Sequence, residues 1–242
     1  MGFLSSLFTG DSKLKQLQDL AERGNSIVQA NLGVMYLAGE GVPQDHVRAA
    51  QWFRRAANQG DALSQSNLGV MYAQGQGVPQ DYEQAEQWAR KAADQGYVMA
   101  QANLGLIYLE GQGVQQDYVK AAQWSRKAAD QGHAPSQSNL GLMYLQGIGV
   151  SQDHGQAEQW FRKSADQGCA LAQRNLGSMY ANGEGVPQDY AQAVQWYILA
   201  KASGDKEAED YLPLAESKAT PAQIAEAQKM AREWWAAHHP GN

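Results

Sequence analysis

The sequence repeats itself every 36 residues, and this periodicity constrains the fold more than any other feature. An Asn-Leu-Gly triplet begins at Asn31, Asn67, Asn103, Asn139 and Asn175. A tryptophan keeps the same spacing, at Trp52, Trp88, Trp124, Trp160 and Trp196. A fixed period of this length indicates units that bury their apolar faces only against their neighbours. The function is therefore expected on the surface that the stacked units create.

Each unit reads as two helices joined by a loop. In the second unit we expect the first helix over residues 62–74, because Leu68, Gly69 and Tyr72 fall at the spacing of one buried helical face. A glycine at that place allows a neighbouring helix to approach closely. The loop that follows contains two glycines, which permit left-handed backbone, and Pro79, which cannot continue a helix.

An aspartate is predicted to start the second helix of each unit. As an N-cap, Asp81 accepts a backbone N–H and suits the positive end of the helix dipole. A glutamine three residues later predicts a capping box in the pairs Asp81 with Gln84, Asp153 with Gln156 and Asp189 with Gln192. The recurring aspartates are therefore interpreted as structural. The tryptophans are interpreted in the same way, since alanines one turn away leave room for a buried indole.

These elements resemble the Sel1-like repeat family, a bacterial relative of the tetratricopeptide repeats with a longer, glycine-bearing loop. The Leu-Gly, Tyr, Gly-x-Gly-Val and Ala-x-x-Trp elements recur in five units. The resemblance implies a right-handed all-α solenoid of about five helix-loop-helix repeats with capping helices at both ends. The expected parts are a segment with a capping helix over 1–24, repeats over 25–60, 61–96, 97–132, 133–168 and 169–204, and capping helices over 205–242.

Both ends are predicted to cap the stack, because an array must cover its terminal apolar faces. The N-terminal cap is predicted from a helical stripe of Leu14, Leu17, Leu20 and Ala21. The C-terminal cap is predicted as a helix over about 206–218 followed by a last helix. Thr220 and Pro221 favour the start of that last helix, as an N-cap with proline at the first helical position.

Composition excludes some partners. The formal net charge of -6 argues against a nucleic-acid partner, and no apolar run approaches 18 residues, so no integral membrane segment is expected. Basic pairs recur on the second helices, at Arg54-Arg55, Arg90-Lys91, Arg126-Lys127 and Arg162-Lys163. We interpret them as cations that suit the last turn of a helix. A basic ladder that contacts a partner remains the alternative.

Cys169 is the only cysteine, so an intrachain disulfide is excluded. This favours a reducing compartment, and the expected location is the cytoplasm. Cys169 occupies the same place in its unit as Asp61, Tyr97 and His133, and we interpret it as exposed and incidental.

The first residues fit the Met-Gly-x-x-x-Ser pattern of N-myristoylation, with Gly2 and Ser6 in place. A lipid anchor of this kind would be relevant if the protein were secreted into a host cell. The alternative interpretation is that the apolar side chains of this segment cap the first repeat or stay disordered.

No pattern of catalytic or metal-binding residues is recognised. The five histidines, His46, His133, His154, His238 and His239, form no repeated ligand spacing. The Gly-x-Gly-Val loops lead to helices capped by aspartate, which would repel a phosphate group. We therefore expect no catalytic residue, no cofactor and no metal ion.

The remaining candidate is the inner surface of the stack. The resemblance implies that the first helices line the concave side, where an asparagine ladder would lie between apolar side chains. An asparagine can both donate to and accept from the peptide backbone of any partner. The predicted partner-binding residues are Asn31, Asn67, Val70, Asn103, Leu106, Asn139, Leu142 and Asn175. The alternative is that these asparagines brace neighbouring repeats.

The sequence therefore predicts a non-enzymatic scaffold or adaptor that binds a protein or an extended peptide segment in its concave groove. One alternative is an immunity or inhibitor protein that clamps a folded enzyme. A further alternative, suggested for some members of the family, is a hydrolase.

Overall fold

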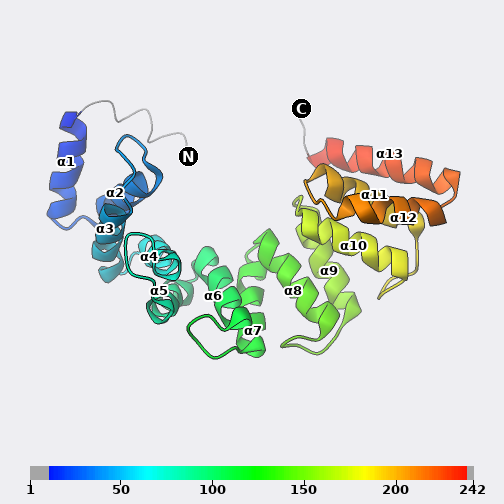
Figure 1. Ribbon diagram of the computed structural model, residues 1–242, viewed down its shortest axis with the longest axis horizontal. Helices are drawn as coiled ribbons and strands as arrows, with labels where there is room; N and C mark the ends of the chain where they lie inside the picture. The colour runs from blue at the N-terminus through cyan, green and yellow to red at the C-terminus, as the bar shows by residue number, and fades with distance from the viewer. Residues whose placement is uncertain (1–10, 239–242) are drawn as a thin grey trace. The chain divides into compact units, whose positions relative to one another are not determined.

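The computed structural model describes residues 11–238 and contains thirteen helices and no strand in that range (Figure 1). The chain divides into two compact units, unit 1 ending at Asp117 and unit 2 beginning at Tyr118. Unit 1 contains α1 (Asp11–Glu22), α2 (Ser26–Ala38), α3 (His46–Asn58), α4 (Ala62–Gln74), α5 (Tyr82–Asp94) and α6 (Val98–Glu110). Unit 2 contains α7 (Tyr118–Asp130), α8 (Ala134–Gln146), α9 (His154–Ala165), α10 (Ala170–Asn182), α11 (Tyr190–Ala202), α12 (Ala208–Lys218) and α13 (Pro221–His238).

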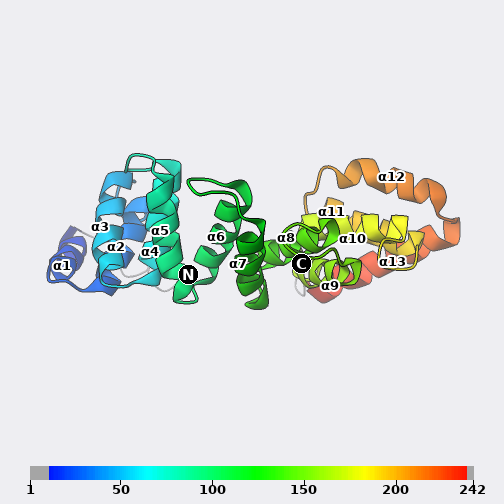
Figure 2. The ribbon, with the colours of Figure 1, turned by 90° about the horizontal axis from the view of Figure 1, so that it is seen from below.

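Within each unit, helices pack on their neighbours in chain order. In unit 1, α2 pairs with α3 and α4 with α5, and α3 packs in turn on α4 (Figures 1 and 2). In unit 2, α8 pairs with α9 and α10 with α11, and α11 also packs on α12 and α13. The chain is thus an all-α solenoid of helix pairs with terminal helices, as the sequence predicted. The predicted bounds of the first helix in the second repeat, 62–74, agree with α4.

Three features hold the loop of the second repeat: a left-handed glycine, a glutamine side chain and a capping aspartate. In the second repeat, α4 ends at Gly75, whose φ of 67° is left-handed. The Gln80 side chain donates from Nε2 to the Ala73 carbonyl at 2.8 Å. The Asp81 carboxylate then caps α5 by accepting from the Gln84 N–H at 3.0 Å. The N-cap role predicted for Asp81 is confirmed.

The capping box predicted at Asp81, Asp153 and Asp189 is wrong in its second half. A capping box needs the backbone N–H of the N-cap residue to donate to the glutamine side chain. The Asp81 N–H instead donates to the Tyr72 carbonyl at 3.0 Å, and the equivalent aspartates do the same. Because this N–H donates to the tyrosine carbonyl of the preceding helix, it does not donate to the glutamine side chain. A backbone hydrogen bond therefore closes the loop. The capping box forms elsewhere, at Thr220, whose N–H donates to Gln223 Oε1 at 2.8 Å.

The second loop glycine lies against the preceding repeat. Gly77 has a φ of 68°, and a methyl group added to it would collide with the His46 carbonyl at the start of α3. Gly113 stands in the same relation to Tyr82. The loop therefore lies against the start of the second helix in the preceding repeat, where a side chain on this glycine would not fit.

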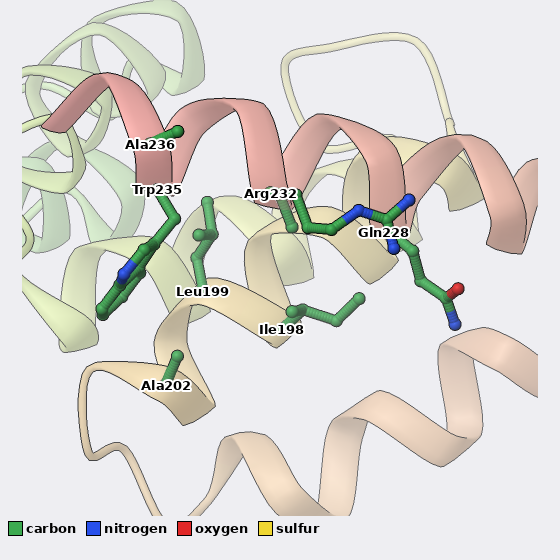
Figure 3. A pocket seen from close by; sticks show the side chains of 8 residues that line it. Ile198, Leu199, Ala202, Gln228, Arg232, Trp235 and Ala236 are labelled. Carbon is green, nitrogen blue, oxygen red and sulfur yellow. The ribbon is translucent and has the colours of Figure 1, made fainter. Parts of the chain in front are cut away.

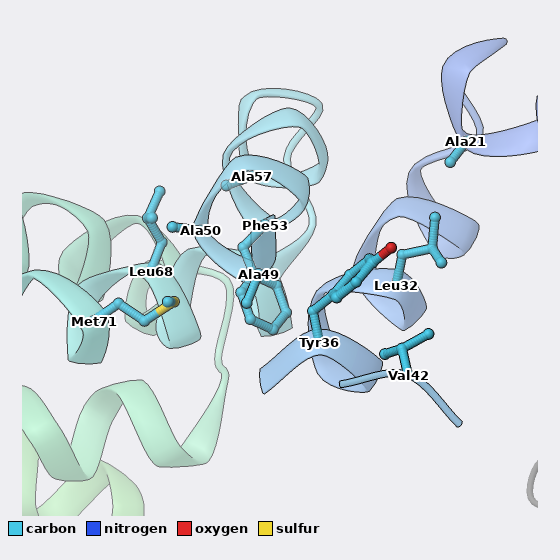
Figure 4. Close-up of a cluster of buried hydrophobic side chains, with 10 residues drawn as sticks. All are labelled: Ala21, Leu32, Tyr36, Val42, Ala49, Ala50, Phe53, Ala57, Leu68 and Met71. Atoms are coloured by element: carbon cyan, nitrogen blue, oxygen red, sulfur yellow. The ribbon is translucent and has the colours of Figure 1, made fainter. Parts of the chain in front are cut away.

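The core of unit 1 is a cluster of buried apolar side chains that includes Leu32, Tyr36, Phe53 and Leu68 (Figure 4). The N-terminal helix α1 contributes Ala21, which is fully buried, and Leu14 and Leu17 pack partly against the same cluster. The predicted stripe is wrong at Leu20, which is 44% exposed.

In unit 2 the terminal helices cover the last repeat. Trp196 of α11 is only 2% exposed and meets Trp234 of α13 edge to face, with ring centroids 6.4 Å apart. Cys169 packs partly against the same core cluster, so the prediction that it is exposed is wrong. It lies at the start of α10, where it is partly buried.

Candidate partner-binding surface

The first helices of unit 1 carry large apolar side chains in contact with solvent. These side chains, which we call the apolar face, are Ile27, Val34, Leu63, Met99 and Leu106. Their exposed fractions run from 36% at Leu63 to 69% at Ile27. Helices α2 and α4 contain no charged residue, so no charge interrupts this face along either helix. Contiguous exposed apolar surface is uncommon in monomeric proteins and usually marks a contact site.

The predicted asparagines lie beside the apolar face and are half-buried. Asn67 donates from Nδ2 to the Leu63 carbonyl of its own helix at 3.0 Å. Asn31 and Asn103 make no side-chain hydrogen bond within the part of the chain that the structure describes. The hydrogen bonds of these three side chains therefore do not connect neighbouring repeats.

A buried glutamine ladder connects the repeats instead, and sequence reasoning missed it. Gln65, 5% exposed, donates from Nε2 to the Ala57 carbonyl at 3.1 Å and accepts at Oε1 from Gln95 Nε2 at 2.7 Å. Unit 2 repeats the arrangement with Gln137, which donates to the Ala129 carbonyl at 3.0 Å and accepts from Gln167 at 2.8 Å. The signal was present, because both glutamines recur at the 36-residue period.

A groove of about 390 Å³ lies between α4, α5 and α6 in unit 1. Its lining includes three of the predicted residues, Val70, Asn103 and Leu106, together with Ala73 and Ile107. Ala85 and Ala89 of α5 line it as well, and the rim includes the exposed Glu110. The structure thus brings Val70, Asn103 and Leu106 together.

The predicted residues of unit 2 are partly buried. Leu142 packs partly against the core cluster that contains Phe161 and Leu176. Asn139 is half-buried, and the Nδ2 atom of Asn175 is buried without a hydrogen-bond partner. Leu142 and Asn175 therefore contribute to packing in this unit.

The basic residues of the second helices are engaged inside the molecule. Arg54, Arg90, Arg126 and Arg162 each donate to the tyrosine hydroxyl of the next repeat, at Tyr72, Tyr108, Tyr144 and Tyr180. Glu86 and Glu158 form ion pairs with Arg90 and Arg162. The neighbouring cation lies over the tryptophan of its own helix, as Lys91 does 4.1 Å from the Trp88 centroid. Burial raises the pKa of the Tyr180 hydroxyl, so it stays a neutral acceptor for Arg162.

A second hollow, of about 430 Å³, lies in unit 2 between α11 and α13 (Figure 3). Ile198, Leu199 and Trp235 supply apolar walls, and Arg232 and Gln228 extend along one side. No repeated sequence signal marks this hollow, because it depends on how the last helix packs on α11.

No group of three or more His, Cys, Asp or Glu residues is close enough to hold a metal ion in residues 11–238. Among the helices in this range, none is both long and apolar enough to cross a membrane. The myristoylation pattern at Gly2 and Ser6 lies outside the described residues.

Comparison with known proteins identifies the repeat. The Sel1 repeat profile matches residues 26–61, 62–97, 98–133, 134–169 and 170–205. A protective antigen of uropathogenic Escherichia coli, whose crystal structure displays the same fold, is 36% identical over 93% of this chain, with a TM-score of 0.81. The alignment covers 48% of that antigen, so the chain spans about half of its length. A comparison with curated proteins found no match.

Two other solved structures extend the likeness. A Sel1 repeat protein from Oxalobacter formigenes is 34% identical, with a TM-score of 0.76, and the alignment covers 86% of this chain and 85% of that one. An immunity protein from Pseudomonas aeruginosa, 19% identical with a TM-score of 0.52 over 87% of this chain and 83% of its own, shares the fold alone. Five consecutive matched repeats and two relatives above 30% identity place the chain in one family: it belongs to the Sel1 repeat family.

Proposed function

We propose that this chain is a non-enzymatic scaffold that binds an extended segment of another protein along the apolar face of unit 1. A Sel1 repeat scaffold suits protein–protein interaction, because stacked helices present a long, continuous surface. The observation that carries the finer proposal is the groove between α4, α5 and α6, which adjoins this face and is lined by Val70, Asn103 and Leu106.

The face offers the two kinds of contact that an extended segment needs. Its apolar side chains would cover apolar side chains of the partner, with a gain of about 25 cal/mol per Å² of apolar area buried. The asparagines beside them, Asn31, Asn67 and Asn103, retain hydrogen-bonding capacity that can be used by a peptide backbone. The arginines on the second helices are already bonded to tyrosines, which makes a basic ladder a weaker candidate for partner recognition.

The test uses segments selected from a displayed random-peptide library on the full chain. Binding of a selected peptide is then measured for Met99→Glu and for the matched control Val47→Glu. Both residues are exposed apolar residues of unit 1, at 48% and 54%, but only Met99 belongs to the apolar face, since Val47 lies on the second helix α3.

We expect Met99→Glu to weaken binding by at least tenfold and Val47→Glu to leave it within twofold, with both variants folded by circular dichroism. Equal losses in the two variants, or a loss only in Val47→Glu, would contradict the proposed surface. Strong salt sensitivity together with loss on Arg54→Ala would instead favour the second helices.

A further inference from the structure

The residue after each tryptophan lies where the second helix of a repeat faces the first helix of the same repeat. It is Phe53, Ala89, Ser125, Phe161 and Tyr197 in the five repeats. In three of these repeats an aromatic ring lies against the glycine of the first helix. A methyl group added to Gly33, Gly141 or Gly177 would come within 2.6 to 2.7 Å of carbon atoms of Phe53, Phe161 and Tyr197, respectively.

The second repeat lacks this ring. An added methyl group at Gly69 would meet the Ala85 carbonyl at 3.1 Å and the Ala89 backbone nitrogen at 3.2 Å, so α4 packs directly on the backbone of α5. Gly69 and Ala89 both line the groove, together with Leu106 and Ile107 of α6. The groove is therefore found in the one repeat of unit 1 where alanine replaces the ring.

The volume and the lining of the groove suit an aromatic side chain of a partner protein. An engineered apolar cavity of about 150 Å³ binds benzene, and this groove of about 390 Å³ is larger. Tyr82 and the polar residues Gln74, Asn103 and Gln112 line part of the groove. The aliphatic part of its lining includes the alanines of α5 and the side chains of Val70, Leu106 and Ile107. These are the kinds of side chain that contact the internal rings elsewhere, as Leu68 and Ala49 do in the cluster around Phe53.

The rim adds a charge. Glu110, at the end of α6, lines the groove and is exposed. Its carboxylate accepts a hydrogen bond from Gln112, and it forms no ion pair within the described part of the chain. A cation beside the bound ring would therefore meet an unneutralised carboxylate, at a cost in desolvation that is small for an exposed group.

We propose that the groove beside Ala89 is an anchor site for an aromatic side chain that is followed by a lysine or arginine in the partner segment. This inference rests on the proposed function, since it assigns one residue type to one place on the same surface. The ring would lie in the groove lined by Ala89, Leu106 and Ile107, beside the close contact of α4 with α5.

Two capped dipeptides test the anchor on the full chain: acetyl-Phe-Lys-amide and acetyl-Ala-Lys-amide. We expect the first to shift the methyl NMR signals of Val70, Ala89 and Leu106 at millimolar concentration, and the second to shift them at least tenfold less. Acetyl-Phe-Glu-amide should bind at least threefold more weakly than acetyl-Phe-Lys-amide, and Glu110→Gln should remove that difference.

Two variants address the site, because Ala89→Phe alone could disturb the packing of α4 on α5. Ala89→Phe fills the groove, and Leu106→Glu, at a residue that is 40% exposed, places a charge on its wall. Both should abolish the methyl shifts, whereas the control Val47→Glu, on α3 and outside both the apolar face and the groove lining, should preserve them.

Three outcomes would overturn the anchor site: equal shifts from the alanine and phenylalanine dipeptides, shifts confined to residues between α11 and α13, or unchanged binding in Leu106→Glu. Failure of the anchor is distinguishable from failure of the proposed function. If a selected peptide loses affinity for Met99→Glu but binds Ala89→Phe as well as the parent protein, the proposed surface stands and the anchor site is wrong.

Discussion

The second repeat, in unit 1, and the fourth repeat, in unit 2, share one pattern, yet the second leaves a groove beside Ala89 where the fourth has the buried ring of Phe161. In unit 1, Ala89 stands in the groove between α4, α5 and α6. In unit 2, the equivalent Phe161 is fully buried in the core cluster, and Leu142 packs partly against that cluster. In these two repeats the residue after the tryptophan is alanine beside the groove and phenylalanine in the core.

The units also differ in how far their tryptophans are buried. Trp52 and Trp88 of unit 1 are half-buried, whereas Trp124, Trp160 and Trp196 of unit 2 are at most 7% exposed. Unit 2 has in addition α12 and α13 packed on α11. We infer that unit 2 contributes more packing to stability and unit 1 contributes more accessible apolar surface.

The largest expected effect is the loss of stability on removing the buried ring of Phe161. Phe161→Ala removes a side chain that is fully buried, and should lower the free energy of unfolding by about 3–5 kcal/mol. Ala89→Phe, the reverse change in unit 1, should cost less than this, because an open groove can receive part of the ring. Urea unfolding of both variants is the measurement, and a loss in Ala89→Phe as large as in Phe161→Ala would remove the distinction between the units.

A smaller effect is expected when the helical glycines are compared. Gly141→Ala drives a methyl group to 2.7 Å from the Phe161 ring, which has no free space to retreat into, and should cost about 1–3 kcal/mol. Gly69→Ala meets backbone at 3.1 Å and gains about 1 kcal/mol of helix propensity, so it should lie within about 1 kcal/mol of the parent. Thermal unfolding of the two variants tests whether Gly141→Ala is the more destabilising change. A larger loss of stability in Gly69→Ala would show that α5 cannot shift to make room for the methyl group.

The glutamine ladder serves as a control, because both units share it. Gln65→Leu and Gln137→Leu each remove two side-chain hydrogen bonds, to the Ala57 and Ala129 carbonyls and from Gln95 and Gln167. Each variant should lose about 1–3 kcal/mol of unfolding free energy. Similar losses of unfolding free energy in the two variants would show that the units differ in their apolar packing. A loss in only one variant would show that they differ in the glutamine hydrogen bonds.

The smallest effect is a pH dependence restricted to unit 2. His133 caps α8 by accepting at Nδ1 from the Ser136 N–H at 3.3 Å, whereas the equivalent cap in unit 1 is Asp61. Burial lowers the pKa of the His133 imidazole below its usual 6.5, so the folded state binds fewer protons than the unfolded state. Stability should therefore be full above pH 6.5 and decline as the pH falls below it.

His133→Asn retains a good cap without this titration. Its unfolding midpoint in urea, measured from pH 8 to pH 5, should decline less than that of the parent protein. Identical pH profiles for parent and variant would show that the neutral imidazole contributes nothing measurable as a cap.

Much of the local structure was readable from the sequence, since it depends on short-range chemistry. Gly75 and Asp81 predict the end of α4 and the start of α5, because left-handed backbone and an N-cap oxygen are local requirements. The capping box was predicted wrongly at Asp81, because the competing acceptor, the Tyr72 carbonyl, comes from the other helix of the pair. The candidate site shows the same division. Partner-binding residues such as Leu106 were predicted from the sequence, but the groove beside Ala89 between α4, α5 and α6 was not.

By itself, the sequence determined the helix pair, its period and the family, because these follow from apolar spacing, glycine positions and caps that act within a few residues. Only the tertiary structure decided which of the repeated positions face solvent. Exposure depends on what the neighbouring helix contributes: Phe161 lies within the core of unit 2, while Ala89 leaves the wall of α6 uncovered in unit 1. A period of 36 residues makes the positions equivalent along the chain, but the volume of the facing side chain makes them different in space.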